Sequence, residues 1–99
     1  MTSPIRFEVG PSCTIADIAE HVTRWQANLA ADTTSPQGWL IDLSGVEEVD
    51  GAGFQLLVSV CHAASDARQS LQWQWMSEQH PTSWLKTLLQ ASTAEVCHD

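Results

Sequence analysis

Residues 38–57 read GWLIDLSGVEEVDGAGFQLL, and this stretch decides the fold. An apolar run at 39–41 ends on a carboxylate at Asp42, and a short polar link follows it. A second carboxylate, Asp50, stands before the small residues 51–53, and apolar residues then recur at helical spacing. A buried strand, a turn and a helix with an acidic N-cap produce this order of residues. The stretch therefore predicts a strand-to-helix junction in an α/β domain.

Apolar periodicity outside this stretch predicts two more strands and two more helices. The expected order is strand, helix, strand, helix, strand, helix, over residues 5–9, 14–30, 38–43, 51–68, 71–76 and 81–91. Strands connected through helices run parallel, with right-handed crossovers. Polar residues alternate along the first and third strands, and this indicates that helices cover one sheet face only. We therefore expect an α/β fold with a small, mostly parallel or mixed sheet and helices packed mainly on one face.

The helix ends carry their own signals. Thr14 is expected to cap the first helix, and Ile15 is expected to begin its apolar stripe. Pro81 suits the first turn of the third helix, whose apolar side includes Trp84 and Leu88. Residues 94–97 could add a last short strand.

Composition limits the function classes. The 99 residues are expected to form one domain, residues 1–99, and the formal net charge of -8 includes only four Lys and Arg. Nucleic acid and anionic membranes need clustered positive charge, so neither is an expected partner. No leader peptide or membrane span is visible, so no direct membrane insertion is expected. The three cysteines are widely spaced and are interpreted as thiols of a cytoplasmic protein.

Four carboxylates in nine residues raise the question of a metal site. Asp42, Glu47, Glu48 and Asp50 could hold Mg²⁺, which takes carboxylate oxygens and keeps several waters. A phosphoryl-accepting Asp would need further residues that the chain does not supply in a recognisable pattern. We favour an N-cap at Asp50 and a solvated loop at 47–48, with no metal and no cofactor.

Other catalytic patterns are weak. Residues 51–53 resemble a phosphate-binding turn, but they lack the Lys and Ser/Thr of a P-loop and the spacing of a dinucleotide loop. His62 and Asp66 lie one helical turn apart without an evident nucleophile, which favours a surface pair. Cys61 lies in an apolar row and is interpreted as a core residue. The sequence thus favours a protein without catalytic activity.

The junction resembles the signature of the STAS domain (sulfate transporter and anti-sigma factor antagonist). That signature is a hydrophobic strand ending in D-L-S, a short link, D-S-S-G or D-T-A-G, and an apolar helix. The matching residues here are Asp42-Leu43-Ser44 and Asp50-Gly51-Ala52-Gly53, followed by Phe54, Leu56 and Leu57. The later strand and helix fit the family order as well, so the resemblance covers most of the chain.

The resemblance implies a small α/β domain that binds protein partners. In the anti-sigma antagonist branch, a partner kinase phosphorylates the Ser or Thr that directly follows the Asp. Gly51 occupies that slot here and Ala52 the next, so neither carries a hydroxyl. The usual phosphoacceptor is therefore absent, and Ser44 does not match its position.

The resemblance implies an interaction module of a bacterial signalling complex, similar to anti-sigma factor antagonists or to STAS proteins of chemotaxis and sensor-kinase systems. Its partner would be an anti-sigma factor, a kinase-like protein or a chemotaxis component. The alternative is the STAS regulatory subunit of an ABC-type phospholipid transporter, which would bind the ATPase subunit. The expected partner-binding residues are Ser44, Asp50, Gly51, Ala52, Gly53, Gln55, Ser59 and His62.

Overall fold

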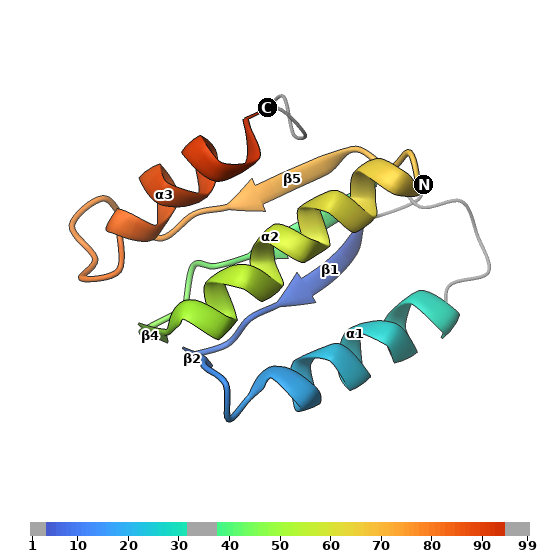
Figure 1. Cartoon of the computed structure of the whole chain (residues 1–99), viewed down its shortest axis with the longest axis horizontal. Helices are drawn as coiled ribbons and strands as arrows, with labels where there is room; N and C mark the ends of the chain where they lie inside the picture. The colour runs from blue at the N-terminus through green and yellow to red at the C-terminus, as the bar shows by residue number, and fades with distance from the viewer. Residues whose placement is uncertain (1–3, 32–37, 95–99) are drawn as a thin grey trace.

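A three-stranded parallel sheet forms one layer of the molecule. The computed structural model describes residues 4–31 and 38–94. The strands are β1 (Ile5–Glu8), β3 (Trp39–Asp42) and β5 (Leu71–Gln74), in the order β1-β3-β5 (Figure 1). The register places Phe7 beside Ile41 and Ile41 beside Trp73. The predicted parallel arrangement is confirmed, and β3 lies in the centre of the sheet.

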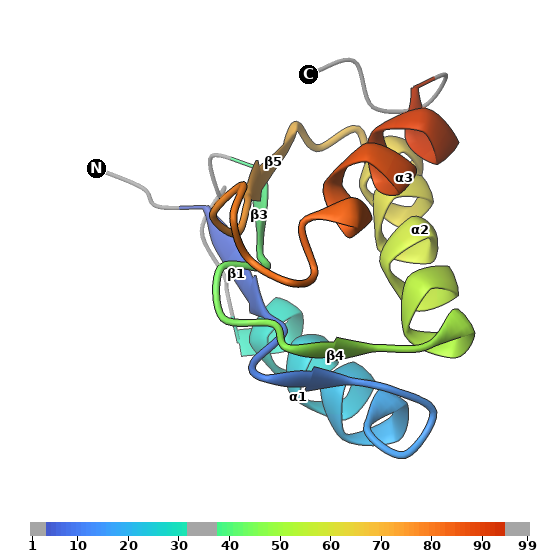
Figure 2. The same cartoon turned by 90° about the vertical axis from the view of Figure 1, so that its left-hand side faces the viewer.

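Within the described residues, three helices pack against the sheet: α1 (Ile18–Ala31), α2 (Gly51–Asp66) and α3 (Trp84–Thr93). Helices α2 and α3 lie to one side of the strands, and α1 runs along the β1 edge (Figure 2). Two right-handed crossovers that step in the same direction across a sheet place their helices on the same face. The architecture is therefore a compact α/β fold with helices on one face, as expected.

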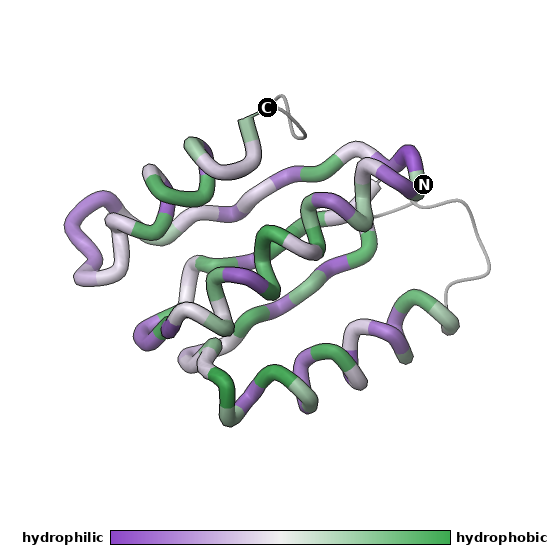
Figure 3. The backbone as a smooth tube through the Cα atoms, viewed as in Figure 1, coloured by the Kyte–Doolittle hydropathy of each residue, from purple (hydrophilic) through white to green (hydrophobic). Residues whose placement is uncertain are grey.

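The burial pattern matches this arrangement. Along β1, Ile5 and Phe7 are buried, whereas Arg6 and Glu8 are exposed, and Figure 3 shows the alternation as hydrophobic and hydrophilic colours. On the helix side, Leu57 of α2 is fully buried over the sheet. The uncovered face carries the polar residues, as the alternation predicted.

A second, very short sheet was not predicted. Strands β2 (Ser12–Cys13) and β4 (Glu48–Val49) pair in parallel. The backbone N–H groups of Glu47 and Glu48 donate to the carbonyl of Pro11, at 2.7 and 3.1 Å. Two-residue strands leave no periodic pattern, which explains why this part of the chain was interpreted as a loop.

Helix α1 starts later than the sequence suggested. The backbone N–H and the hydroxyl of Thr14 both donate to Asp17, so residues 14–17 form a turn and the helix begins at Ile18. The prediction that Thr14 caps the helix is therefore wrong. Ile15, expected on the apolar stripe, is 75% exposed because it lies on this turn.

Helix α3 departs from its prediction in a similar way. It begins at Trp84 instead of near Pro81, because residues 81–83 form a turn. Leu85 and Leu89 are buried, but Trp84 and Leu88 remain substantially exposed. The suggested last strand lies largely outside the described residues.

The cysteines differ from one another. Cys13 is a buried free thiol, whereas Cys61 is disulfide-bonded, so its interpretation as a thiol is wrong. Its predicted place in the core is confirmed. Cys97 lies outside the described residues.

Membrane crossing requires a long apolar helix. Within residues 4–31 and 38–94, none of the helices combines the length and the hydropathy that a bilayer span needs.

Leu57→Ala should lower the free energy of unfolding by about 3 kcal/mol, because it leaves a cavity between α2 and the sheet. Leu88→Ala is the matched control, since this leucine is 44% exposed, and its effect should be below about 1 kcal/mol. Urea unfolding of both variants measures the difference. Equal losses would mean that α2 is not the centre of the core.

Candidate functional site

The N-terminus of α2 is built around Asp50. Its Oδ1 accepts a hydrogen bond from the backbone N–H of Gly53, and its Oδ2 accepts one from that of Ile15, each at 2.9 Å. These two bonds hold the pKa of Asp50 below its ordinary value, and the bond from Ile15 has the largest effect. The carboxylate is therefore a helix cap, as predicted, and it also ties the turn before α1 to the start of α2.

Gly53 permits close contact between α2 and β2. An added Cβ would lie 1.8 Å from the carbonyl oxygen of Cys13, which no side chain can tolerate. The thiol of Cys13 lies 3.8 Å from the carbonyl of Gly53. Burial and the nearby carboxylates of Asp17 and Asp50 raise the pKa of this thiol to about 11, so it stays protonated at neutral pH. This part of the junction is structural.

Gly51 has the opposite environment. It is exposed, and a Cβ added to it would meet no atom within 4 Å. Its φ lies outside the left-handed region, so ordinary residues can adopt its conformation. The fold therefore does not require glycine at the position that corresponds to the phosphoacceptor of the resembled family.

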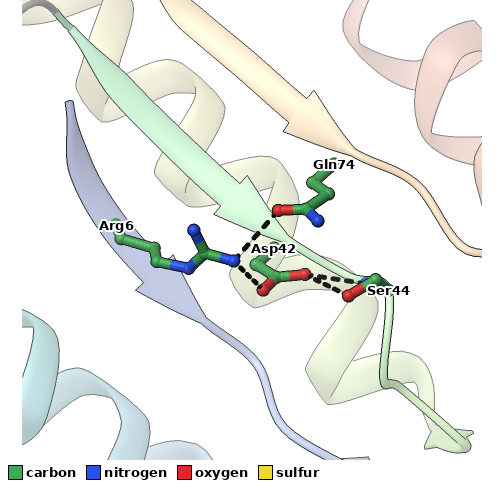
Figure 4. A network of polar contacts seen from close by, with 4 residues as sticks. All are labelled: Arg6, Asp42, Ser44 and Gln74. Carbon is green, nitrogen blue, oxygen red and sulfur yellow. Dashed lines mark hydrogen bonds and ion pairs between the residues drawn. The ribbon is translucent and has the colours of Figure 1, made fainter. Parts of the chain in front are cut away.

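Asp42 forms the second polar centre, at the end of β3 (Figure 4). Arg6 donates to its Oδ2 at 2.6 Å and to Gln74 at 3.0 Å. The backbone N–H and the hydroxyl of Ser44 donate to Oδ1, at 3.0 and 2.6 Å. Burial alone would raise the pKa of Asp42, but the hydrogen bonds from Ser44 and the Arg6 guanidinium outweigh it and lower the pKa.

The carboxylates of the junction do not gather into a metal site. Both oxygens of Asp42 and both oxygens of Asp50 already accept hydrogen bonds within the protein. Glu47 and Glu48 are exposed on the link. In the part of the chain that the structure describes, no three His, Cys, Asp or Glu side chains are placed to hold an ion together. The geometry offers no support for the magnesium alternative.

The predicted partner-binding residues divide by exposure. Ser44, Gly51, Gln55, Ser59 and His62 are exposed, and the last three, spaced by three and four residues, follow one edge of α2.

Asp50 and Ala52 are half-buried, and Gly53 is buried, so Gly53 serves the junction by positioning α2. The sequence did not predict that Ile15 lies on the surface, because its exposure depends on the turn at residues 14–17. Below, "the α2 junction" means Ser44 and residues 50–52 together with the edge residues Gln55, Ser59 and His62.

Comparisons with protein-family models, with curated proteins and with solved structures returned no match for this chain.

Replacing Gly51 and replacing Gly53 should change the stability of the protein in opposite directions. Gly51→Ala should raise the free energy of unfolding by about 0.5 kcal/mol, since it restricts the unfolded chain and meets no neighbour. Gly53→Ala should lower it by about 3 kcal/mol, because α2 must move away from the Cys13 carbonyl. Denaturant unfolding of both variants measures these changes. A Gly53→Ala variant as stable as the natural chain would contradict the close contact.

Lowering the pH should destabilise the protein through Asp42. Its pKa is lower in the folded state than the usual value of 3.8, so its contribution is complete above that value and is lost as the pH falls through the folded pKa. The melting temperature should therefore begin to fall below about pH 5 and should keep falling as the pH drops below 3.8. Asp42→Asn should be less stable at pH 6 and should show a shallower slope, measured by circular dichroism. If the melting temperature of the variant changed with pH as steeply as that of the natural chain, Asp42 would not contribute to the pH dependence of stability.

Proposed function

We propose that this protein is a non-catalytic, STAS-like interaction module of a bacterial signalling complex, and that it binds its partner through the α2 junction. The resemblance of residues 42–44 and 50–57 to the STAS signature supports this proposal. The exposure of the α2 junction in an α/β fold of the expected class supports it as well.

The open environment of Gly51 carries the proposal. A serine or threonine would fit at this position without strain, yet the chain has a residue without a hydroxyl there. Phosphorylation would add a dianion at the helix start and change the docking surface. With glycine in the slot, this position of the docking surface cannot be phosphorylated. The protein would then act as a constitutive partner instead of a kinase-controlled one.

The charge of the surrounding surface indicates the kind of partner. Glu47 and Glu48 are exposed on the link that leads to α2. The whole chain carries a formal net charge of -8. Complementary charge accelerates encounter and disfavours wrong partners. We therefore expect the partner to present basic residues around the site that receives the start of α2.

Gly51→Glu should weaken binding of the natural partner at least tenfold, because a long side chain at this position would hold the partner away from the start of α2 and break the close fit of the two surfaces. The partner is first captured from the native cell with the natural chain, identified by mass spectrometry, and then titrated by calorimetry with each variant. Ala27→Glu, at an exposed position of α1, is the matched control and should bind with unchanged affinity. Gly51→Glu should not lower the melting temperature below that of the natural chain, since a Cβ at this position meets no neighbouring atom.

An unchanged affinity of Gly51→Glu would overturn the α2 junction as the binding surface. The identity of the captured protein separates the two branches of the family. A kinase-like, anti-sigma or chemotaxis protein supports the signalling role, whereas a transporter ATPase would replace it with the regulatory-subunit role.

A further inference from the structure

A groove lies between α1 and α2, on the flank of α2 away from α3. Its floor comes from strands β1 and β3, and its two walls come from the facing helices. The residues that form floor and walls are Phe7, Trp39, Val22, Trp25, Leu56 and Val60. Below, "the α1–α2 groove" means the space that these six residues line.

The floor of the α1–α2 groove is preformed. Phe7 is 1% exposed and meets Trp25 and Trp39 edge to face, with ring centroids 5.5 and 5.1 Å apart. The indole N–H of Trp25 donates to the carbonyl of Glu8 at 3.4 Å, so the polar edge of this ring is already satisfied. The packed rings therefore give the groove a rigid floor, and a ligand would contact mainly the half-buried aliphatic side chains of Val22, Leu56 and Val60 above it.

The lining is uncharged. Among the residues that the structure describes around the α1–α2 groove, none carries a charge, and the polar ones are Gln26 on α1 and Ser59 on α2. Both of these side chains are exposed, so they lie towards the mouth. A charged ligand would lose its hydration without gaining a counter-ion. An apolar body with at most one uncharged polar end fits this distribution.

The size of the α1–α2 groove selects the ligand further. Its volume is about 300 Å³. Apolar cavities of about 150 Å³ already bind benzene, and small-molecule sites begin at about 300 Å³. An α-helix with its side chains is about 10 Å wide, which is too large for this space. The volume thus favours a small molecule over a peptide segment.

We propose that the α1–α2 groove is a binding site for a small, uncharged, apolar molecule of about two rings, with one neutral polar group directed to Gln26 and Ser59. This site shares Ser59 with the α2 junction at its mouth, but it lies between the two helices and does not depend on the function proposed for that junction.

The five tryptophans allow a direct test with 1-naphthol as the probe. Trp25 and Trp39 line the groove, whereas Trp73, Trp75 and Trp84 lie on β5, just after it, and on α3. Titration of the full chain, followed by indole ¹⁵N–¹H resonances, should shift the first two signals and leave the other three in place. The dissociation constant should be about 0.1–1 mM. The same rings with a carboxylate, 1-naphthoate, should bind at least tenfold more weakly.

Two variants close the groove from its rim. Ala63 is exposed and lines the groove, so Ala63→Phe should weaken 1-naphthol binding at least tenfold without disturbing the core. Ser59→Phe provides a second blocking variant at the mouth. Ala27→Phe, exposed on α1 and outside the lining, is the matched control and should bind as the natural chain does.

Several results would overturn the proposal. These are no shift of the Trp25 and Trp39 signals, equal shifts of all five indoles, or undiminished binding by both blocking variants. Equal affinity for 1-naphthoate would contradict the uncharged character of the ligand. If the Trp25 and Trp39 signals instead moved with protein concentration alone, the groove would be covered by a second copy of the chain.

Discussion

The close contact between α2 and β2 is the constraint on which the rest of the junction depends. The Cβ position of Gly53 falls on the carbonyl of Cys13, so only a residue without a side chain lets the helix start there. Asp50 then reaches both the Gly53 amide and the Ile15 amide with one carboxylate. The two-residue sheet, the cap and the turn before α1 are therefore parts of one arrangement.

Sequence periodicity predicted most of the fold but little of this arrangement. The apolar run of β3 and the helical rows of α2 are local signals, and both elements lie where they were expected. The pairing of β2 with β4, by contrast, joins residues that are 36 positions apart in the sequence, and only a few backbone hydrogen bonds hold the two strands together. Ile15 is exposed because it lies on the turn in which the backbone N–H of Thr14 donates to the side chain of Asp17. Such a bond between a side chain and the backbone competes with the start of α1.

The α1–α2 groove has a topological origin. Helix α2 lies over the centre of the sheet and fills it with Leu57, whereas α1 lies near the β1 edge (Figure 1). The position of α1 at the edge of the sheet leaves a space beside α2. Aromatic side chains from β1, β3 and α1 fill the lower part of the space between them but not its mouth. The sequence alone could not reveal this, because the same apolar residues fit a closed helix pair equally well.

The two glycines of the D-G-A-G segment show why a motif has to be analysed residue by residue. In the sequence they are two identical letters at the start of a helix, although only Gly53 matches the glycine of the resembled signature and Gly51 stands in place of its Ser or Thr. In the structure Gly53 is fixed by a contact that any side chain would break, whereas Gly51 is exposed and free of neighbours. Packing therefore explains the second glycine and leaves the first unexplained. Gly51 is therefore the position at which the proposed docking surface departs from the resembled signature without any requirement of the fold.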